Sequence, residues 1–278
     1  VRVHDQPLPA DGGAGFEVSD RVLVMDPHLD GSNDIAAGLR LGGDALAVLA
    51  LEAVLALLAL VAGGAPALVA ALAGRLLKKN EIVRQNRWND RTSYMGQGLA
   101  SRTLGLVGAG GVGQEILRVA RPFFGRMIAA DPYADPTKIR DLGADILPLD
   151  TVMAEADFVV VACLLDDSTR HLIDAKVLQA LGPRGYLINV ARGSVVDEAA
   201  LIEALKAGTI AGAALDVYAD EPNVPQALWS MPNVVLTPHM ASATHETRQA
   251  MADLAYANLH AGVTGAPLRT PVPECAAR

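Results

Sequence analysis

The sequence predicts an α/β protein built on a doubly wound parallel sheet, and three observations lead to this fold class. Short apolar runs alternate with helical segments between residues 104 and 236, which is typical of parallel strands with helices on both faces. The run Phe158–Leu164 is apolar throughout, as expected for a strand that is covered on both sides. A G-x-G-x-x-G motif, Gly108–Gly113, directly follows the first apolar run.

Each expected strand is a short apolar run, and helical segments lie between most of them. Strands are expected at Leu104–Val107, Met127–Ala130, Asp145–Pro148, Phe158–Leu164, Gly185–Val190, Ala211–Leu215 and Asn233–Leu236. Helices are expected at Gln114–Ala120, Pro136–Leu142, Asp150–Ala156, Lys176–Leu181, Asp197–Ala207 and His245–Val263. Gly208 is placed to close the helix that ends at Ala207, because glycine tolerates the left-handed backbone of a helix C-terminus.

The composition excludes several classes of protein. A net charge of -8 without a basic run argues against a nucleic-acid partner. Cys163 and Cys275 are too few for a disulfide framework, and Cys163 lies in an apolar strand pattern that indicates a core residue. No His/Cys cluster has the spacing of a zinc site, so no metal is expected. The first residues lack the apolar region of a signal peptide, and a cytoplasmic protein is expected.

The segment Ala45–Ala62 is almost entirely Ala, Leu and Val, interrupted only by Glu52. It is at the lower limit of the length that spans a membrane, but no basic flank or interfacial aromatic residue follows it directly. We therefore expect a buried helix rather than a membrane span, ended by Gly63–Pro66, and its apolar surface favours a homodimer.

The glycine motif predicts a site for a dinucleotide. The first glycine makes the tight turn, the second admits the pyrophosphate and the third packs the helix on the strand. The segment that would hold the cofactor comprises Gly108, Gly110, Gly111, Val112 and Gly113. The next strand ends at Asp131, near the spacing of about 20 residues expected for the carboxylate that binds the adenosine ribose. Asp131 would repel a 2′-phosphate, so NAD is favoured over NADP; a glycine-rich turn in another βαβ unit is the alternative.

Three polar side chains each follow an apolar run near the C-terminal end of the chain: Arg192, Glu221 and His239. Ligands bind at the carboxyl ends of strands in open α/β sheets. Arg192 can bind a carboxylate through two hydrogen bonds, His239 can move a proton at neutral pH, and Glu221 can orient the imidazole. The simpler alternatives are a surface cation, a turn residue and a loop histidine.

At these motifs the chain resembles the D-isomer-specific 2-hydroxyacid dehydrogenases. The resemblance runs from about Arg84 to Pro273. The matching stretches are Leu104–Gly113, Ala191–Gly193, Val196–Leu201, Ala214–Pro222 and Leu236–His239. The stretch Asn233–Glu274 is most similar to bacterial glyoxylate/hydroxypyruvate reductases.

The resemblance implies further cofactor contacts. Asp216 corresponds to an aspartate near the nicotinamide, with a turn carboxylate as the alternative, and Thr169 corresponds to a threonine near the phosphates. Val190 and Ala191 also belong to the implied cofactor site. Leu164 stands where the family usually has a proline, which leaves the adenosine contact open at this position.

The resemblance also implies two domains. Residues 1–43 and 242–278 would form a shortened, discontinuous, flavodoxin-like substrate domain, and residues 44–241 the dinucleotide-binding domain with its linker helix. Val22–Met25 is expected as one strand of the former. Gly31, within Leu29–Asp34, is similar to the glycine loop that holds the substrate carboxylate.

The expected function is NAD(P)H-dependent reduction of a small 2-oxo acid to the D-2-hydroxy acid. Arg192 would bind the carboxylate, assisted by Gly31, and His239 with Glu221 would supply the proton. The alternatives are an enzyme like phosphoglycerate dehydrogenase and a dinucleotide-sensing binding protein with weak catalysis. The expected partners are a small-molecule acid and a second copy of the chain, with no membrane.

Overall fold

The computed structural model describes residues 2–4, 17–18, 21–24, 64–240 and 243–270. The chain divides into two compact units, residues 1–50 and 51–278. In the first unit, strand β3 (Arg21–Val24) pairs antiparallel with β1 (Arg2–His4) and β2 (Glu17–Val18). The strand expected at Val22–Met25 is therefore present as β3. Most of residues 1–43 lie outside the described ranges, so the predicted substrate domain is not tested.

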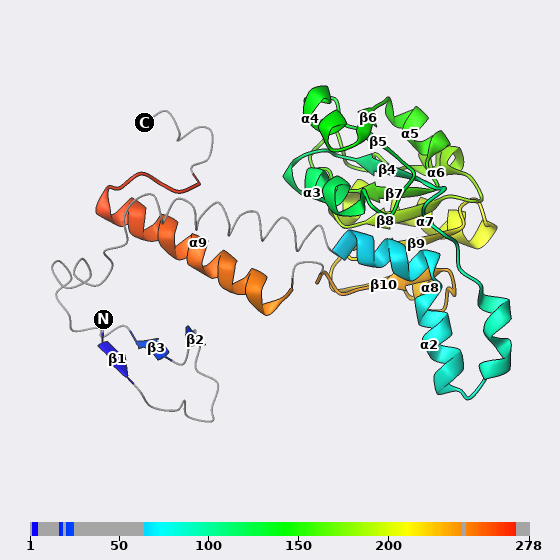
Figure 1. The fold of residues 1–278 in the computed structure, drawn as a ribbon, viewed down its shortest axis with the longest axis horizontal. Helices are drawn as coiled ribbons and strands as arrows, with labels where there is room; N and C mark the ends of the chain where they lie inside the picture. The colour runs from blue at the N-terminus through cyan, green and yellow to red at the C-terminus, as the bar shows by residue number, and fades with distance from the viewer. Residues whose placement is uncertain (1, 5–16, 19–20, 25–63, 241–242, 271–278) are drawn as a thin grey trace. The chain divides into compact units, whose positions relative to one another are not determined.

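The second unit contains a seven-stranded sheet in which every pairing is parallel (Figure 1). Its strands are β4 (Thr103–Val107), β5 (Arg126–Ala130), β6 (Ala144–Ile146), β7 (Phe158–Val161), β8 (Tyr186–Asn189), β9 (Gly212–Leu215) and β10 (Val234–Leu236). The order across the sheet is β10-β9-β8-β7-β4-β5-β6. The strand order reverses between β4 and β7, which is the pattern of a dinucleotide-binding fold with one added edge strand. The predicted doubly wound parallel sheet is confirmed.

Helices lie on both faces of this sheet (Figure 1). The described helices of this unit are α2 (Leu76–Arg84), α3 (Gly111–Ala120), α4 (Pro136–Asp141), α5 (Leu149–Glu155), α6 (Ala175–Leu181), α7 (Glu198–Ala207), α8 (Gln226–Trp229) and α9 (His245–Thr264), with 3-10 turns η1 (Trp88–Tyr94) and η2 (Gly193–Val195). Residues 64–73 are also helical. The helices at α3 to α7 and α9 match the predicted ones to within a few residues. Helices α2 and α8 and both 3-10 turns were not expected.

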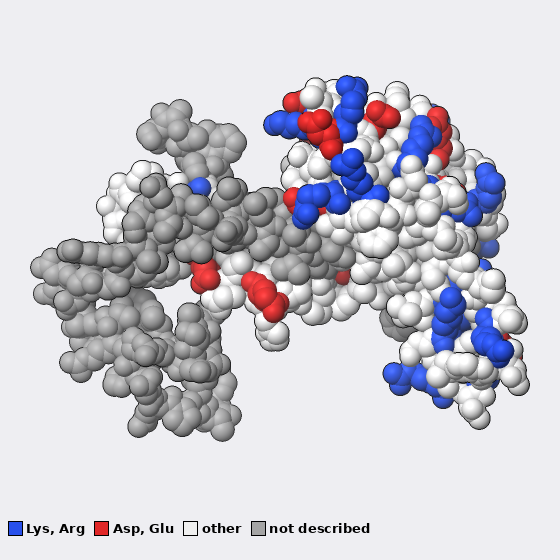
Figure 2. Space-filling model, viewed as in Figure 1, with Lys and Arg blue, Asp and Glu red and all other residues white. Residues whose placement is uncertain are grey.

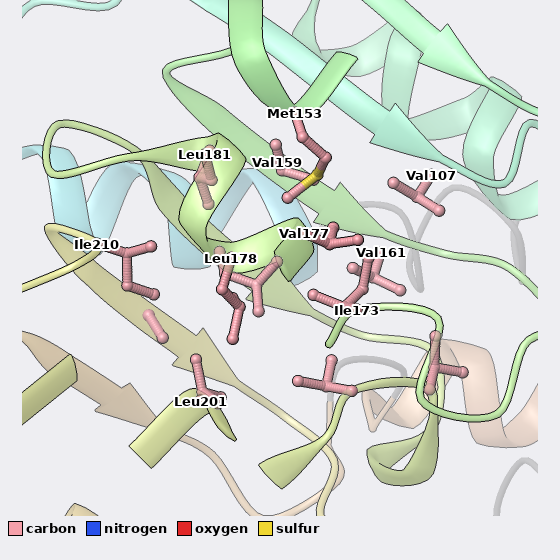
Figure 3. Packing of buried hydrophobic residues seen from close by; sticks show 14 of the residues in the cluster. Val107, Met153, Val159, Val161, Ile173, Val177, Leu178, Leu181, Leu201 and Ile210 are labelled. Carbon is pink, nitrogen blue, oxygen red and sulfur yellow. The ribbon is translucent and has the colours of Figure 1, made fainter. Parts of the chain in front are cut away.

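Two hydrophobic cores sandwich the sheet. Helices α5, α6 and α7 cover one face and pack against Val159 and Val161 of β7 (Figure 3). Residues 64–73 and helices α3 and α4 cover the other face, where Phe158 and Val160 point. All four of these β7 side chains are fully buried. Successive side chains of a strand point to opposite faces, which is why a doubly covered strand is apolar at every position.

Aspartate side chains cap the N-termini of helices α6 and α7. Asp174 accepts a hydrogen bond from the Val177 amide at the start of α6, and Asp197 accepts one from the Ala200 amide at the start of α7. These contacts satisfy amides that have no partner within the helix. Gly208 has φ of 68° after α7, so the predicted glycine closure is confirmed.

The strand predicted at Phe158–Leu164 is too long. Strand β7 ends at Val161, whose partners Val107 and Asn189 are the last residues of β4 and β8. Leu164 is 85% exposed. The apolar run continues beyond Val161, but no neighbouring strand extends far enough to pair with it, so the chain leaves the sheet.

The helix end predicted at Gly63–Pro66 is not tested, because the segment Ala45–Ala62 lies outside the described residues. Gly64 and Pro66 are helical. Leu68, Val69 and Leu72 of the same helix are buried against the sheet, and Pro66 lies in the first described turn, where a proline is tolerated.

Several predictions fall outside the described residues. These are the apolar segment Ala45–Ala62 and the loop with Gly31. Within the described ranges, no helix is long and apolar enough to cross a membrane. The assignment of residues 1–43 and 242–278 to one substrate domain stays a prediction.

Charged side chains are unevenly distributed on the face shown in Figure 2. Lys and Arg gather over α2, whereas both signs of charge are mixed over α4.

Candidate active site

The predicted polar residues follow three neighbouring strands and lie at one edge of the sheet. Strands β8, β9 and β10 are adjacent and parallel, so their carboxyl ends meet. Arg192 follows β8, Glu221 follows β9 and His239 follows β10. All three side chains lie in loops at this edge and are exposed to solvent.

Glu221 and His239 form a hydrogen-bonded pair. Nδ1 of His239 lies 2.8 Å from Oε2 of Glu221, and Oε1 of Glu221 accepts a hydrogen bond of 3.0 Å from the Tyr218 amide. Partial burial opposes ionisation of Glu221, but these hydrogen bonds and the charges of His239 and Arg192 together lower its pKa. The ionised carboxylate therefore fixes the imidazole and leaves the other ring nitrogen available for a proton transfer.

Arg192 is held by its own loop. The Asn189 side chain donates to the Arg192 carbonyl at 3.0 Å and accepts from the Ala191 amide at 3.1 Å. Asn189 is only 1% exposed, so a buried side chain fixes the turn, whereas Arg192 itself is exposed to solvent. One guanidinium nitrogen donates to the Ala191 carbonyl at 2.6 Å. The positive charge of Arg192 is among the causes that lower the pKa of Glu221.

Asp216 ties the loop with His239 to strand β9. It is 2% exposed, and its Oδ1 accepts hydrogen bonds from the Thr237 hydroxyl at 2.6 Å and the Met240 amide at 2.9 Å. These donors lie on either side of His239, which has φ of 54°. Few residues other than glycine adopt this left-handed backbone, so Asp216 helps to hold an uncommon conformation. Its predicted position near the nicotinamide stays a prediction.

The glycine motif has the geometry that a dinucleotide requires. Gly108 has φ of 93°, and a side chain there would collide with the Cys163 backbone. A side chain on Gly113 would meet the Gly108 carbonyl oxygen, whereas Gly110 faces open space. Gly108 therefore makes the tight turn, Gly110 leaves room for a ligand to approach the backbone, and Gly113 allows helix and strand to pack closely. Helix α3 begins at Gly111 and its N-cap Gly110 provides no side-chain cap, so its first amides can bind an anion.

Asp131 lies where the sequence places it, at the end of β5, but it also contacts the glycine loop. Its Oδ2 accepts from the Ala109 amide at 2.7 Å, and its Oδ1 accepts from the Tyr133 and Ala134 amides at 2.8 and 3.2 Å. A carboxylate has about four acceptor positions, so these three bonds still leave capacity for a ribose hydroxyl. The same carboxylate therefore shapes the glycine loop, and its predicted contact with the ribose stays a prediction.

The remaining predicted cofactor residues lie at the same edge of the sheet. Val190 and Ala191 follow β8, and the Ala191 amide is taken by Asn189. Thr169 lies in the loop after β7, where its hydroxyl donates to the Leu164 carbonyl at 2.6 Å. The contact of Thr169 is thus internal to the loop, and its predicted approach to a phosphate is not tested. Val112 lies in the first turn of α3.

One cavity lies elsewhere in the fold. A cavity of about 270 Å³ opens at the amino ends of β8 and β10, lined in part by Leu72, Arg75, Lys78, Tyr94 and Tyr186. None of the predicted site residues lines it. In the ranges that can be described, no three His, Cys, Asp or Glu side chains come together as metal ligands.

Sequence reasoning missed the residues that support the site. Asn189, Tyr218 and Thr237 each contact a predicted residue or its loop. Their only sequence signal is position, because each lies at the end of a strand or one turn beyond it.

An α/β dinucleotide-binding fold with a glutamate–histidine pair and an arginine at the carboxyl edge defines a class of nicotinamide-dependent proteins. Residues 66–241 match the family model described as D-isomer specific 2-hydroxyacid dehydrogenase, NAD binding domain. The chain belongs to this family, and the resemblance found in the sequence is confirmed.

Several relatives are similar over most of the chain. A glyoxylate reductase from Thermococcus onnurineus is 40% identical over 71% of this chain and 61% of its own length. A glyoxylate/hydroxypyruvate reductase A from Arabidopsis thaliana is 40% identical over 74% of this chain and 64% of its own length. The chain thus spans about three fifths of the length of the curated relatives it matches.

A solved structure agrees with these relatives. The NADPH-dependent glyoxylate/hydroxypyruvate reductase from Sinorhizobium meliloti, in complex with NADP and malonate, is 41% identical with a TM-score of 0.72. The match covers 79% of this chain and 68% of that chain.

Proposed function

We propose that the protein reduces a small 2-oxo acid of the glyoxylate or hydroxypyruvate type to the D-2-hydroxy acid. The observation that carries this proposal is the hydrogen-bonded pair of His239 and Glu221 at the same edge of the sheet as Arg192. These groups match the needs of the reaction, which are a carboxylate anchor and a proton donor at neutral pH.

Each residue has a distinct task. Arg192 binds the substrate carboxylate through two parallel hydrogen bonds. His239 donates a proton from its outer ring nitrogen to the oxygen that develops at C2. Glu221 keeps the imidazole oriented through the hydrogen bond to its Nδ1. A bound nicotinamide cofactor supplies the hydride for C2.

The relatives support this substrate class. Their printed names are glyoxylate reductase and glyoxylate/hydroxypyruvate reductase, and the S. meliloti enzyme holds malonate, a small dicarboxylate. A carboxylate-binding arginine in this chain agrees with such ligands. For the cofactor, Asp131 favours NADH by repelling a 2′-phosphate, although the S. meliloti enzyme is NADPH-dependent.

The test is a turnover assay that follows loss of the reduced nicotinamide absorbance. Glyoxylate, hydroxypyruvate, pyruvate and 3-phosphohydroxypyruvate are each offered with NADH and, separately, with NADPH. The proposal expects turnover with glyoxylate or hydroxypyruvate, faster with NADH, and a D-configured product where the product is chiral. Preference for the phosphorylated acid would favour the phosphoglycerate dehydrogenase alternative. Tight NADH binding without any turnover would favour the sensing protein.

We also propose that two copies of the chain associate. Leu76, Leu77 and Val83 of α2, Trp88 of η1 and Met95 just after it are more than half exposed. Exposed apolar side chains gathered on one segment indicate an interaction surface. Light scattering after size-exclusion chromatography should give the mass of two chains, and the doubly charged variant L77K/W88K should give one.

A further inference from the structure

Tyr218 contacts the loops of all three proposed active-site residues, and we infer that it is the positioning residue that sets their relative placement. The inference rests on the proposed function, because the groups it positions are Arg192, Glu221 and His239. Tyr218 lies three residues beyond β9 and is 7% exposed. Because Tyr218 is buried, we expect it to affect the site through the loops that it contacts.

The contact with the glutamate is made by the backbone. The Tyr218 amide donates a hydrogen bond of 3.0 Å to Oε1 of Glu221. The other oxygen of the same carboxylate accepts from His239. The position of Tyr218 therefore determines the direction from which Glu221 meets the imidazole.

The contact with the histidine loop is made by the side chain. The Tyr218 hydroxyl lies 3.0 Å from the Thr237 carbonyl and 3.2 Å from the Leu215 carbonyl. Thr237 is two residues before His239, and Leu215 is the last residue of β9. The hydroxyl therefore bridges the ends of β9 and β10. Burial, followed by the charge of Asp216, raises the pKa of Tyr218 to about 12, so the hydroxyl remains a donor through the neutral range.

The contact with the arginine loop is steric. A side chain on Gly193 would collide with the carbonyl group of Tyr218 and the amide of Ala219. The backbone after Arg192 consequently rests directly on the backbone of Tyr218.

The substitution Y218F isolates the hydroxyl, because it keeps the ring in the core and removes only the bridge to Thr237. The matched control is Y186F. The Tyr186 hydroxyl accepts a hydrogen bond from Gln97 at the opposite end of the sheet, so the same atom is removed far from the three loops. Steady-state kinetics with the preferred 2-oxo acid and a pH series are measured for the wild type and both variants.

We expect Y218F to lower kcat by about three- to tenfold, the range that corresponds to losing one neutral hydrogen bond. The KM for NADH should stay unchanged, and the basic limb of the pH–rate profile should move to lower pH because Glu221 and His239 are less well aligned. Y186F should match the wild type in all three quantities. A Y218F enzyme with wild-type kcat and pH profile would overturn the inference, since Tyr218 would then only fill space.

A second measurement separates this inference from the proposed reaction. The ring protons of His239, assigned by their loss in the variant H239Q, are followed by NMR as the pH is changed. The inference expects the titration midpoint of this imidazole to fall in Y218F and to stay constant in Y186F. If the wild type reduces no 2-oxo acid, the proposed function fails while the NMR result still decides whether Tyr218 positions the pair. An unchanged midpoint in Y218F would sink the inference whatever the activity.

Discussion

His239 and Glu221 meet across two strand ends, with Nδ1 of His239 2.8 Å from Oε2 of Glu221 although the residues are 18 positions apart. The pairing joins the loop after β9 to the loop after β10. It brings an imidazole and a carboxylate to the same edge of the sheet as Arg192.

The pH dependence of activity follows from the state of Glu221. Its pKa lies below the usual 4.5, since the hydrogen bonds and positive charges around it outweigh its partial burial. The stabilising contribution of its ionised form is therefore complete above pH 4.5 and is lost as the pH falls through the lowered pKa. We expect the acid limb of kcat/KM to lie below pH 4.5. In E221Q, kcat/KM at neutral pH should fall by about 10- to 100-fold, as expected when a hydrogen bond to a charged group is lost.

The control for E221Q is D220N. Asp220 is the exposed neighbour of Glu221 and bonds to Asn223 rather than to the histidine. If D220N lowers kcat/KM as much as E221Q does, the effect comes from general charge in the loop and not from the pair.

The variant H239Q should lose turnover and retain NADH binding. General acid catalysis is typically worth about 10² to 10⁴ in rate, and His239 is remote from the glycine loop in sequence and strand order. The measurements are kcat and the Kd of NADH by fluorescence. H245Q is the matched control, because His245 begins α9 and is exposed. Retained turnover in H239Q would remove the acid role from this residue.

The variant R192K should raise the KM for the 2-oxo acid by at least about tenfold. Lysine keeps the positive charge but cannot donate two parallel hydrogen bonds to one carboxylate. The KM for NADH should change little. The conservative change R170K in a neighbouring exposed loop serves as the control, and an unaltered KM for glyoxylate in R192K would contradict the carboxylate anchor.

The variant D131N should weaken NADH binding by about tenfold and narrow the preference for NADH over NADPH. The neutral amide no longer repels a 2′-phosphate, and it can accept from fewer amides of the glycine loop than the three that Asp131 binds. D135N is the control, since Asp135 caps α4 through Thr137 and lies in the same loop. The Kd values of both cofactors decide the outcome; a D131N protein that still prefers NADH as strongly would assign the discrimination to other residues.

The variant G193A should destabilise the protein by about 1–3 kcal/mol, the usual cost of forcing an extra methyl group into a filled space. The new Cβ would meet the Tyr218 carbonyl, so the loop with Arg192 must shift and activity should fall with stability. Urea unfolding measures the change, with G110A as a comparison because a methyl group there meets open space. Equal stability of G193A and the wild type would show that the two loops are not in tight contact.

The sequence determined the fold through its pattern of burial. A strand covered on both faces must be apolar at every position, and Phe158–Val161 meets this condition. The glycine motif was equally informative, because the tight turn at Gly108 and the packing of Gly113 each exclude a side chain. The same reasoning overextended β7 to Leu164, since an apolar run records hydrophobicity and not where the neighbouring strands end.

The sequence also placed Arg192, Glu221 and His239 after strands, but it could not state which strands are neighbours. Only the tertiary structure decided that β8, β9 and β10 lie side by side, that Asp216 holds both flanks of His239, and that Tyr218 touches all three loops. The physical reason is that a motif records local backbone needs, whereas these contacts join residues far apart in the chain and exist only once the strands have paired.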